Sequence, residues 1–169
     1  MKWFYSIISI LMTPVLLIAI YGIFSEHNTE NLETLYWENK EEFCEVADEL
    51  IRITRRNETP IGTYISTEST ADMRLAEQKD DLYFYTTLYS YPKTDYADMY
   101  ASVVDLISSQ DLACVAVDPG RVDFCVAQTY FGSFHLFYVA DGAPFKTDTM
   151  MIKEKTKICD GWYAVVTYN

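Results

Sequence analysis

The stretch CVAVDPGRVDFC, which runs from Cys114 to Cys125, decides the fold class expected for this chain. Two runs rich in valine flank the turn DPGR, and this pattern predicts an antiparallel β-hairpin. If Val117 pairs with Val122, the same register places Cys114 directly opposite Cys125. Opposed residues in an antiparallel pair have Cα atoms about 4.5 or 5.5 Å apart, and both separations permit a disulfide bond. The register therefore predicts that these two cysteines are cross-strand neighbours.

The predicted register gives the hairpin two different faces. One face carries the larger apolar side chains, and the other carries small side chains and both cysteines. The first face consists of Val115, Val117, Val122, Phe124 and Val126, and the second consists of Cys114, Ala116, Cys125 and Ala127. A face of small residues is suited to a closely packed helix. It therefore raises the alternative that a cysteine on a helix bonds to a cysteine of this sheet.

The chain has four cysteines, which allow three disulfide pairings in an oxidising compartment. The favoured interpretation joins Cys114 to Cys125 and Cys44 to Cys159. In one alternative Cys44, on the first expected helix, bonds to a sheet cysteine. In the other, all four are buried free thiols. No Cys-x-x-Cys occurs, and no histidine lies at ligand spacing from a cysteine, so no metal site is expected.

Strand patterns continue on both sides of this hairpin. The expected strands toward the C-terminus cover residues 112–117, 122–131, 134–140, 149–159 and 162–168. The pairs Gly132-Ser133 and Asp160-Gly161 are typical of two-residue hairpin turns. Toward the N-terminus, residues 61–67 and 82–91 predict two further strands, and the second of these alternates with a period of two. Residues between 67 and 82 give only weak signals.

Two helices are expected before the last group of strands. Residues 31–56 carry one apolar stripe and predict one helix, with Asn28, Thr29 and Asn31 as cap candidates. A second helix begins at Thr94 or Asp95 and continues to residue 107. The predicted fold is α+β: a helix, two strands, a helix and an antiparallel five-strand meander. This order is similar to that of cystatin-like, profilin-like and extracellular sensor domains, which share no single function.

An uncharged apolar segment, WFYSIISILMTPVLLIAIYGIF, covers residues 3–24. A helix of this length rises about 33 Å, enough to cross the hydrocarbon core of a membrane. Lys2 precedes the segment and Glu26 follows it, which predicts that the rest of the chain lies on the extracytoplasmic side of a cell membrane. A cleaved signal peptide is the alternative, and it would make the protein secreted or periplasmic. The expected parts are residues 1–24, an anchor or signal peptide, and residues 25–169, an extracytoplasmic domain.

The charge of the chain bears on its partners. Its 169 residues include 25 acids and 13 bases, for a net charge of −12. Proteins that bind nucleic acid need clustered Lys and Arg, so nucleic acid is excluded as the leading partner. Residues 26–49 contain nine acids against the single base Lys40, and this concentration could attract a basic protein partner at long range.

Catalytic chemistry is not indicated by any motif. His27 and His135 are the only histidines, and His135 is expected beside Tyr130 as an ordinary strand residue. The metalloprotease, phosphate-binding and dinucleotide-binding motifs are all absent, so neither enzymatic activity nor a cofactor is expected. The paired acids Asp80-Asp81 are expected to be solvated.

One aromatic row is the candidate binding surface. Tyr83, Tyr85, Tyr89 and Tyr91 share one face of the strand expected over residues 82–91. Tyrosine is enriched at interfaces, so these side chains should be partly exposed if they bind a partner. The predicted function is a non-enzymatic extracytoplasmic protein-interaction domain, such as an envelope-complex accessory, an inhibitor or an immunity-like protein. The alternatives are a sensor-like domain with a small-molecule pocket between sheet and helix, and an enzyme of unrecognised type.

Overall fold

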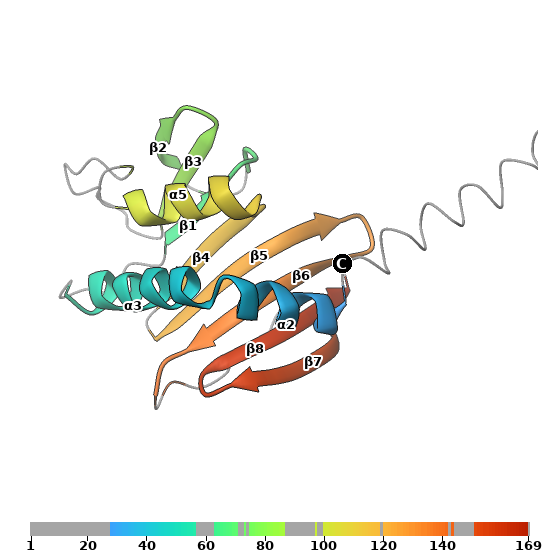
Figure 1. Cartoon of the computed structure of the whole chain (residues 1–169). Coiled ribbons are helices and arrows are strands. Elements are labelled where there is room, and N and C mark those ends of the chain that lie inside the picture. The colour runs from blue at the N-terminus through green and yellow to red at the C-terminus, as the bar shows by residue number, and fades with distance from the viewer. Residues whose placement is uncertain are drawn as a thin grey trace, which may run out of the picture.

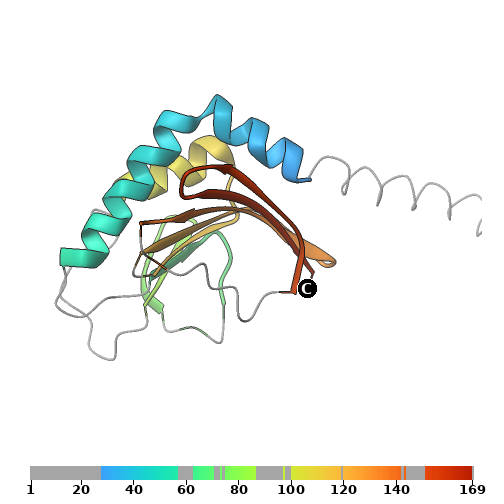
Figure 2. The same ribbon diagram turned by 90° about the horizontal axis from the view of Figure 1, so that it is seen from below.

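The computed structural model describes residues 28–56, 63–70, 73, 75–86, 97, 100–118, 120–141, 143 and 151–168. It confirms the α+β class: one antiparallel sheet of eight strands is covered on one face by helices (Figures 1 and 2). The strands lie in the order β2-β3-β1-β4-β5-β6-β8-β7. None of the helices in the described ranges is long and apolar enough to cross a membrane, and the apolar segment 3–24 falls outside those ranges.

The elements have the following bounds. The helices are α2 (Thr29–Glu38), α3 (Lys40–Arg56) and α5 (Ala101–Gln110). The first four strands are β1 (Thr63–Ser66), β2 (Leu75–Lys79), β3 (Leu82–Thr86) and β4 (Cys114–Asp118). The last four strands are β5 (Arg121–Thr129), β6 (Gly132–Val139), β7 (Met151–Cys159) and β8 (Trp162–Tyr168).

The central hairpin of β4 and β5 has the predicted register. Cys114 is opposite Cys125, and Val117 is opposite Val122. The valine face packs on the helices, where the rings of Phe43 and Phe124 meet at 5.3 Å. The expectation that a helix could pack on the small-residue face is therefore wrong. The larger side chains face the helices because they bury more apolar area there.

The first helical stretch is two helices rather than one. Asn28 caps α2 as predicted, because its side-chain oxygen accepts a hydrogen bond from the Asn31 N–H at 2.8 Å. The helix then ends at Asn39, whose backbone and side-chain N–H groups both donate to the Leu35 carbonyl. This break lets α2 and α3 take different directions over the curved sheet (Figure 2). The apolar pattern alone runs through Asn39 and so does not reveal the break.

Three strand predictions need correction. Strand β2 forms in the segment that gave only weak signals. The last five strands are not a simple meander, because β8 lies between β6 and β7. The turn expected at Gly132-Ser133 lies instead at residues 130–131, and β6 begins at Gly132. Gly132 is needed within the sheet, since a Cβ atom there would lie 2.1 Å from the backbone oxygen of Thr167.

Other predictions about the elements are confirmed where they can be compared. Strands β1 and β8 lie within the expected ranges, and the turn at Asp160-Gly161 is found, with Gly161 at a φ of 78°. The caps expected at Thr94 and Asp95 lie outside the described residues, as do Tyr89 and Tyr91.

Candidate functional site

An open pocket lies between the β2–β3 hairpin and helix α5, on the helix-covered side of the sheet. Its volume is about 480 Å³. Leu82 and Phe84 of β3 line it together with Ile107 and Leu112, and all four side chains belong to the buried core. A pocket with an apolar floor can accept the apolar part of a ligand.

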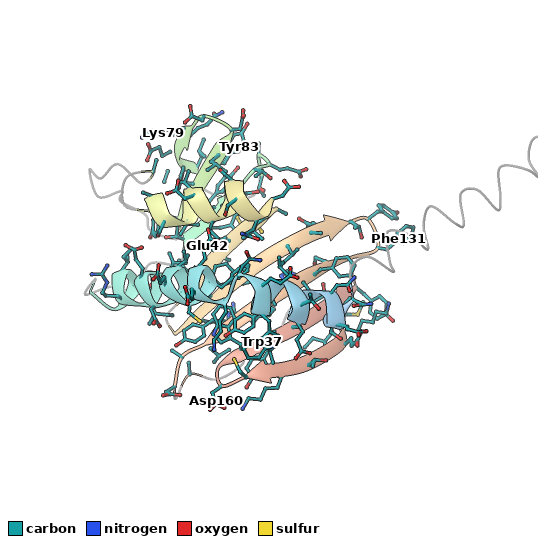
Figure 3. All side chains as sticks on the ribbon, in the orientation of Figure 1. Trp37, Glu42, Lys79, Tyr83, Phe131 and Asp160 are labelled. Atoms are coloured by element: carbon teal, nitrogen blue, oxygen red, sulfur yellow. The ribbon has the colours of Figure 1, made fainter. Side chains whose placement is uncertain are left out.

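Four carboxylates surround this pocket, which we call the aspartate pocket. Asp80 and Asp81 come from the β2–β3 turn, Asp105 from α5, and Asp111 from the C-terminal end of α5. All four are exposed. Lys79 is the one basic residue among the described residues of the lining, and Figure 3 shows it on the hairpin beside α5. The pair Asp80-Asp81, expected only to be solvated, is therefore part of a formed cavity.

The C-terminal end of α5 adds to the negative potential of the aspartate pocket. Asp111 caps the helix with a φ of 52°, and its N–H donates to the Ile107 carbonyl. No basic residue occupies the last turn of α5. Since helix C-termini carry partial negative charge, the helix dipole and the carboxylates both favour a bound cation. The arrangement suits a cation on an apolar stem, such as a lysine or arginine side chain.

The acids of α3 have two separate roles. Glu42 accepts hydrogen bonds from Ser109 at 2.9 Å and Gln110 at 3.1 Å, and Glu49 accepts one from Ser102 at 2.6 Å. These bonds join α3 to α5, and Figure 3 places Glu42 between the two helices. Other acids of α3 remain exposed and add to the charge of the same side of the molecule; they are Glu41, Glu45 and Asp48.

The predicted tyrosine row lies on the opposite face of the sheet. Tyr83 is half-buried and stacks on Tyr85 at 6.5 Å. Tyr85 is buried, and its hydroxyl accepts a hydrogen bond from the Thr70 N–H at 2.6 Å. The expectation of partial exposure is therefore wrong for Tyr85, because its polar end is satisfied inside the domain. Tyr64 of β1 continues the row, with its ring 5.9 Å from that of Tyr85.

A buried group of polar side chains extends this row across the sheet. Cys114 of β4 lies opposite Cys125 of β5, and Cys125 lies opposite His135 of β6. The Nδ1 atom of His135 lies 2.7 Å from the Oδ1 atom of Asp123. With Tyr64, these residues form what we call the thiol–histidine cluster. Sequence reasoning identified both cysteines but did not predict the contact between His135 and Asp123.

The environment of the thiol–histidine cluster makes its two thiols unequal. A hydrogen bond from Cys125, helped by one from Tyr64, lowers the pKa of the Cys114 thiol, although burial opposes this effect. The same bond, together with burial, raises the pKa of Cys125 well above its usual range. Burial works against a charge on His135, but the charge and hydrogen bond of Asp123 outweigh it, so the pKa of His135 is raised.

The position of His135 depends on an irregularity in strand β5. The register between β5 and β6 shifts between Cys125 and Ala127, which is a β-bulge. The pairing of Thr129 with Gly132, if continued without the bulge, would place His135 opposite Val126. The bulge instead brings Cys125 opposite His135, which lies between the core residues Phe134 and Leu136 on β6 and so faces the other side of the sheet. The expected position beside Tyr130 is wrong for this reason and because the turn itself lies two residues earlier.

The other two cysteines both contact Tyr36 on the helix-covered side. The hydroxyl of Tyr36 lies 3.7 Å from the sulfur of Cys44 and 3.3 Å from the sulfur of Cys159. Both cysteines pack against the main core, whereas Cys114 and Cys125 lie on the other face. The sheet therefore separates two thiol pairs, and all four cysteines are free thiols in this structure.

The described residues contain no group of three His, Cys, Asp or Glu side chains that could hold a metal ion. No family model, no curated protein and no solved structure matches this chain.

Proposed function

We propose that residues 25–169 form a non-enzymatic, extracytoplasmic interaction domain that binds a basic segment of a protein partner. The aspartate pocket carries this proposal, because it combines four carboxylates, a helix C-terminus and an apolar floor. A lysine or arginine side chain would place its apolar stem on Leu82 and Phe84 and its charge among the carboxylates. The exposed acids of α3 would increase the rate at which a basic partner arrives.

The proposed anchor is residues 3–24, unless they are removed as a signal peptide. Asn28 begins the described part of the chain, and the few residues between it and Phe24 span at most about 14 Å. The start of α2 is held to strand β7, since the Thr29 hydroxyl donates to Glu154 at 2.6 Å. An anchored domain would therefore hold this end close to the membrane surface.

Exposed apolar side chains at the same end support this orientation. Tyr130 is 89% exposed, and Phe131 beside it is half exposed. Met151 and Tyr168 are also exposed and are opposite each other on β7 and β8. Figure 1 shows the β5–β6 turn, the C-terminus and the start of α2 at one end of the domain. Aromatic residues are favoured at the interface between membrane and water.

Binding to the aspartate pocket can be tested with the full chain in a mild detergent. The probe is a fluorescent peptide of repeating Lys-Gly-Ser units, and its anisotropy reports binding. Replacing Asp105 and Asp111 together by Asn should weaken binding about tenfold, since two carboxylates of the pocket are lost. The matched control replaces Glu41 by Gln and Asp48 by Asn on α3, which changes the net charge equally. We expect the control to weaken binding less than about twofold.

Two outcomes would reject the proposed partner. Equal weakening in both double variants would show that the peptide responds only to net charge. A small polyamine such as spermidine that binds more tightly than the peptide, and loses affinity in the pocket variant alone, would favour the small-molecule alternative. That alternative uses the same pocket between sheet and helix.

A further inference from the structure

The thiol–histidine cluster has chemistry that binding at the aspartate pocket does not use. It lies on the other face of the sheet, and its members come from strands β1, β4, β5 and β6. Hairpin register holds Cys114 and Cys125 opposite each other, so their Cα atoms are within the range for a disulfide. A disulfide can therefore form here without rearrangement of the backbone.

The two thiols differ in the ways that a reactive pair requires. Both thiols are buried, but Cys114, at 7% exposed, is more accessible than Cys125, at 2%. Cys114 also accepts the hydrogen bonds of Cys125 and Tyr64, which stabilise its thiolate. Cys125 keeps its proton, because the hydrogen bond with Cys114 and burial raise its pKa, and its thiol also donates to the Ala127 carbonyl at 3.6 Å. Attack therefore starts from Cys114 rather than from Cys125, because the thiolate is the nucleophile and the pKa of Cys114 is the lower of the two.

His135 is the second, independent sign of a reactive site. It is 5% exposed, and its Nε2 atom has no hydrogen-bond partner among the described residues. A buried polar atom without a partner costs about 1–3 kcal/mol. The His135–Asp123 pair lies directly beside the cysteines, where a proton on His135 favours the thiolate of Cys114 and the negative charge of Asp123 opposes it.

The charged groups around His135 come from several strands. Asp123 lies on β5, and Cys114 and Tyr64 lie on β4 and β1. On the other side Val165 of β8 lies between His135 of β6 and Lys155 of β7, and the Nζ atom of Lys155 lies 4.5 Å from the ring centre of Tyr163. Only Asp123 makes a close ion pair with His135 among the described residues.

We propose that Cys114 and Cys125 form a redox-active dithiol that exchanges with disulfides, with Cys114 as the attacking sulfur and Cys125 as the resolving one. The Cys114 thiolate attacks one sulfur of a disulfide RSSR, the S–S bond breaks, and RS⁻ leaves and takes up a proton. The Cys125 sulfur, on losing its proton, then attacks Cys114 in the mixed disulfide and releases the second RSH. Overall, the dithiol loses two electrons and two protons to RSSR, which becomes two RSH. The reverse reaction oxidises a partner dithiol.

Tyr64 is a positioning residue in this proposal, because it acts on Cys114 through a hydrogen bond. The variant Tyr64→Phe removes only the hydroxyl and should leave the fold intact. The matched control is Tyr83→Phe, on the same row but stacked on Tyr85 rather than bonded to a thiol. Both variants are made in a Cys44→Ser, Cys159→Ser background, so that only the cross-strand pair reacts.

The first readout is the rate of alkylation by iodoacetamide, resolved by residue with mass spectrometry and followed against pH in the full chain. At pH 6 we expect Cys114 to react at least tenfold faster than Cys125. Tyr64→Phe should move the midpoint of the Cys114 pH profile upward and slow the reaction at pH 6 several-fold, whereas Tyr83→Phe should not. Equal reactivity of the two cysteines, or equal effects of the two tyrosine variants, would overturn the proposal.

The second readout is equilibrium with mixtures of reduced and oxidised glutathione. A redox-active pair converts fully between dithiol and disulfide as the mixture is changed. A pair that stays oxidised in reduced glutathione is a structural disulfide, and one that stays reduced in oxidised glutathione is a pair of structural thiols. Either result would contradict the proposal without affecting the one made for the aspartate pocket, which lies on the other face.

Discussion

The two thiol pairs of this domain each contact a tyrosine hydroxyl, but their surroundings differ. In each pair, a tyrosine hydroxyl contacts sulfur: Tyr36 on the helix-covered side, and Tyr64 on the opposite face. In the helix-side pair, Cys44 comes from helix α3 and Cys159 from the end of edge strand β7. The cross-strand pair joins two neighbouring strands that are already hydrogen-bonded.

The surroundings of the two pairs indicate that a disulfide would have a different effect in each. Cys44 and Cys159 lie among apolar side chains at the edge of the core, where a covalent bond would chiefly limit the unfolded chain. The cross-strand pair closes a short loop, so a bond there adds less stability. It lies instead beside the buried contact between His135 and Asp123, which brings a titratable imidazole next to the thiols. The helix-side pair is therefore suited to a stabilising disulfide, and the cross-strand pair is suited to a reactive one.

The largest expected effect concerns the helix-side pair. A disulfide between Cys44 and Cys159 would close a loop of about a hundred residues and stabilise the domain by up to roughly 5 kcal/mol. It would also break the contacts of both sulfurs with Tyr36, which offsets part of this gain. Guanidinium unfolding of the oxidised full chain, with and without Cys44→Ser, measures the difference. If the Cys44–Cys159 disulfide stabilised the domain by less than the roughly 3 kcal/mol expected for a cross-strand disulfide, the assignment of the helix-side pair as the stabilising one would be wrong.

A slightly smaller effect is expected at the buried ion pair. Asp123→Asn removes the carboxylate that pairs with the buried His135 and should lower the free energy of unfolding by roughly 3 kcal/mol. The matched control is Asp118→Asn, which removes a half-exposed carboxylate paired with Arg121 on the same hairpin. Surface pairs of that kind contribute less than about 1 kcal/mol. Equal losses in the two variants would show that the Asp123–His135 pair is not the special feature of this face.

The pH dependence of stability follows from the raised pKa of His135. A raised pKa in the folded state gives stability that is full below the unfolded value, near pH 6.5, and is lost as the pH rises through the folded value. A Cys114→Ser background is used, because the lowered pKa of Cys114 contributes with the opposite sign. In that background the free energy of unfolding should fall as the pH rises above about 6.5. His135→Gln should remove this fall, and a fall that persists would assign it to another group.

The smallest expected effect is at Tyr36. Tyr36→Phe keeps the ring that packs on Trp162 at 4.8 Å and removes only the contacts of the hydroxyl with two thiols. Sulfur is a weak hydrogen-bond partner, so the loss of stability should be about 1 kcal/mol or less. Tyr36→Phe should also speed disulfide formation between Cys44 and Cys159, because neither sulfur then has a hydroxyl contact to give up. Slower formation would mean that Tyr36 positions the two sulfurs rather than separates them.

The predictable part of the fold lies where local pattern and turn chemistry agree. The hairpin around DPGR fixes the register of Cys114 with Cys125, and the turn at Asp160-Gly161 fixes the start of β8. The errors arise where tertiary contact overrides local preference. Gly132 looks like a turn residue, but the close approach of β8 needs it within a strand. The insertion of β8 between β6 and β7 has no local signal at all.

The candidate sites also contain some features that local sequence predicts and others that only tertiary contact sets. The position of Cys114 opposite Cys125 follows from the hairpin register, whereas the contact of Cys44 and Cys159 with Tyr36 has no signal in the sequence. The contact of His135 with Asp123 could not be predicted, because it depends on a one-residue bulge after Cys125. The aspartate pocket joins Asp80 and Asp81 to Asp105 and Asp111 only after β2 forms and packs near α5. The spacing of these aspartates in the sequence does not predict that packing.

The most direct test of two separate thiol pairs is non-reducing peptide mapping of the full chain after titration with oxidised glutathione. The fold predicts two disulfide products only, one joining Cys114 to Cys125 and one joining Cys44 to Cys159, because the sheet lies between the pairs. The cross-strand bond should be the one that reopens in reduced glutathione. A peptide joining Cys44 or Cys159 to either cross-strand cysteine would contradict the separation of the pairs and the register on which it depends.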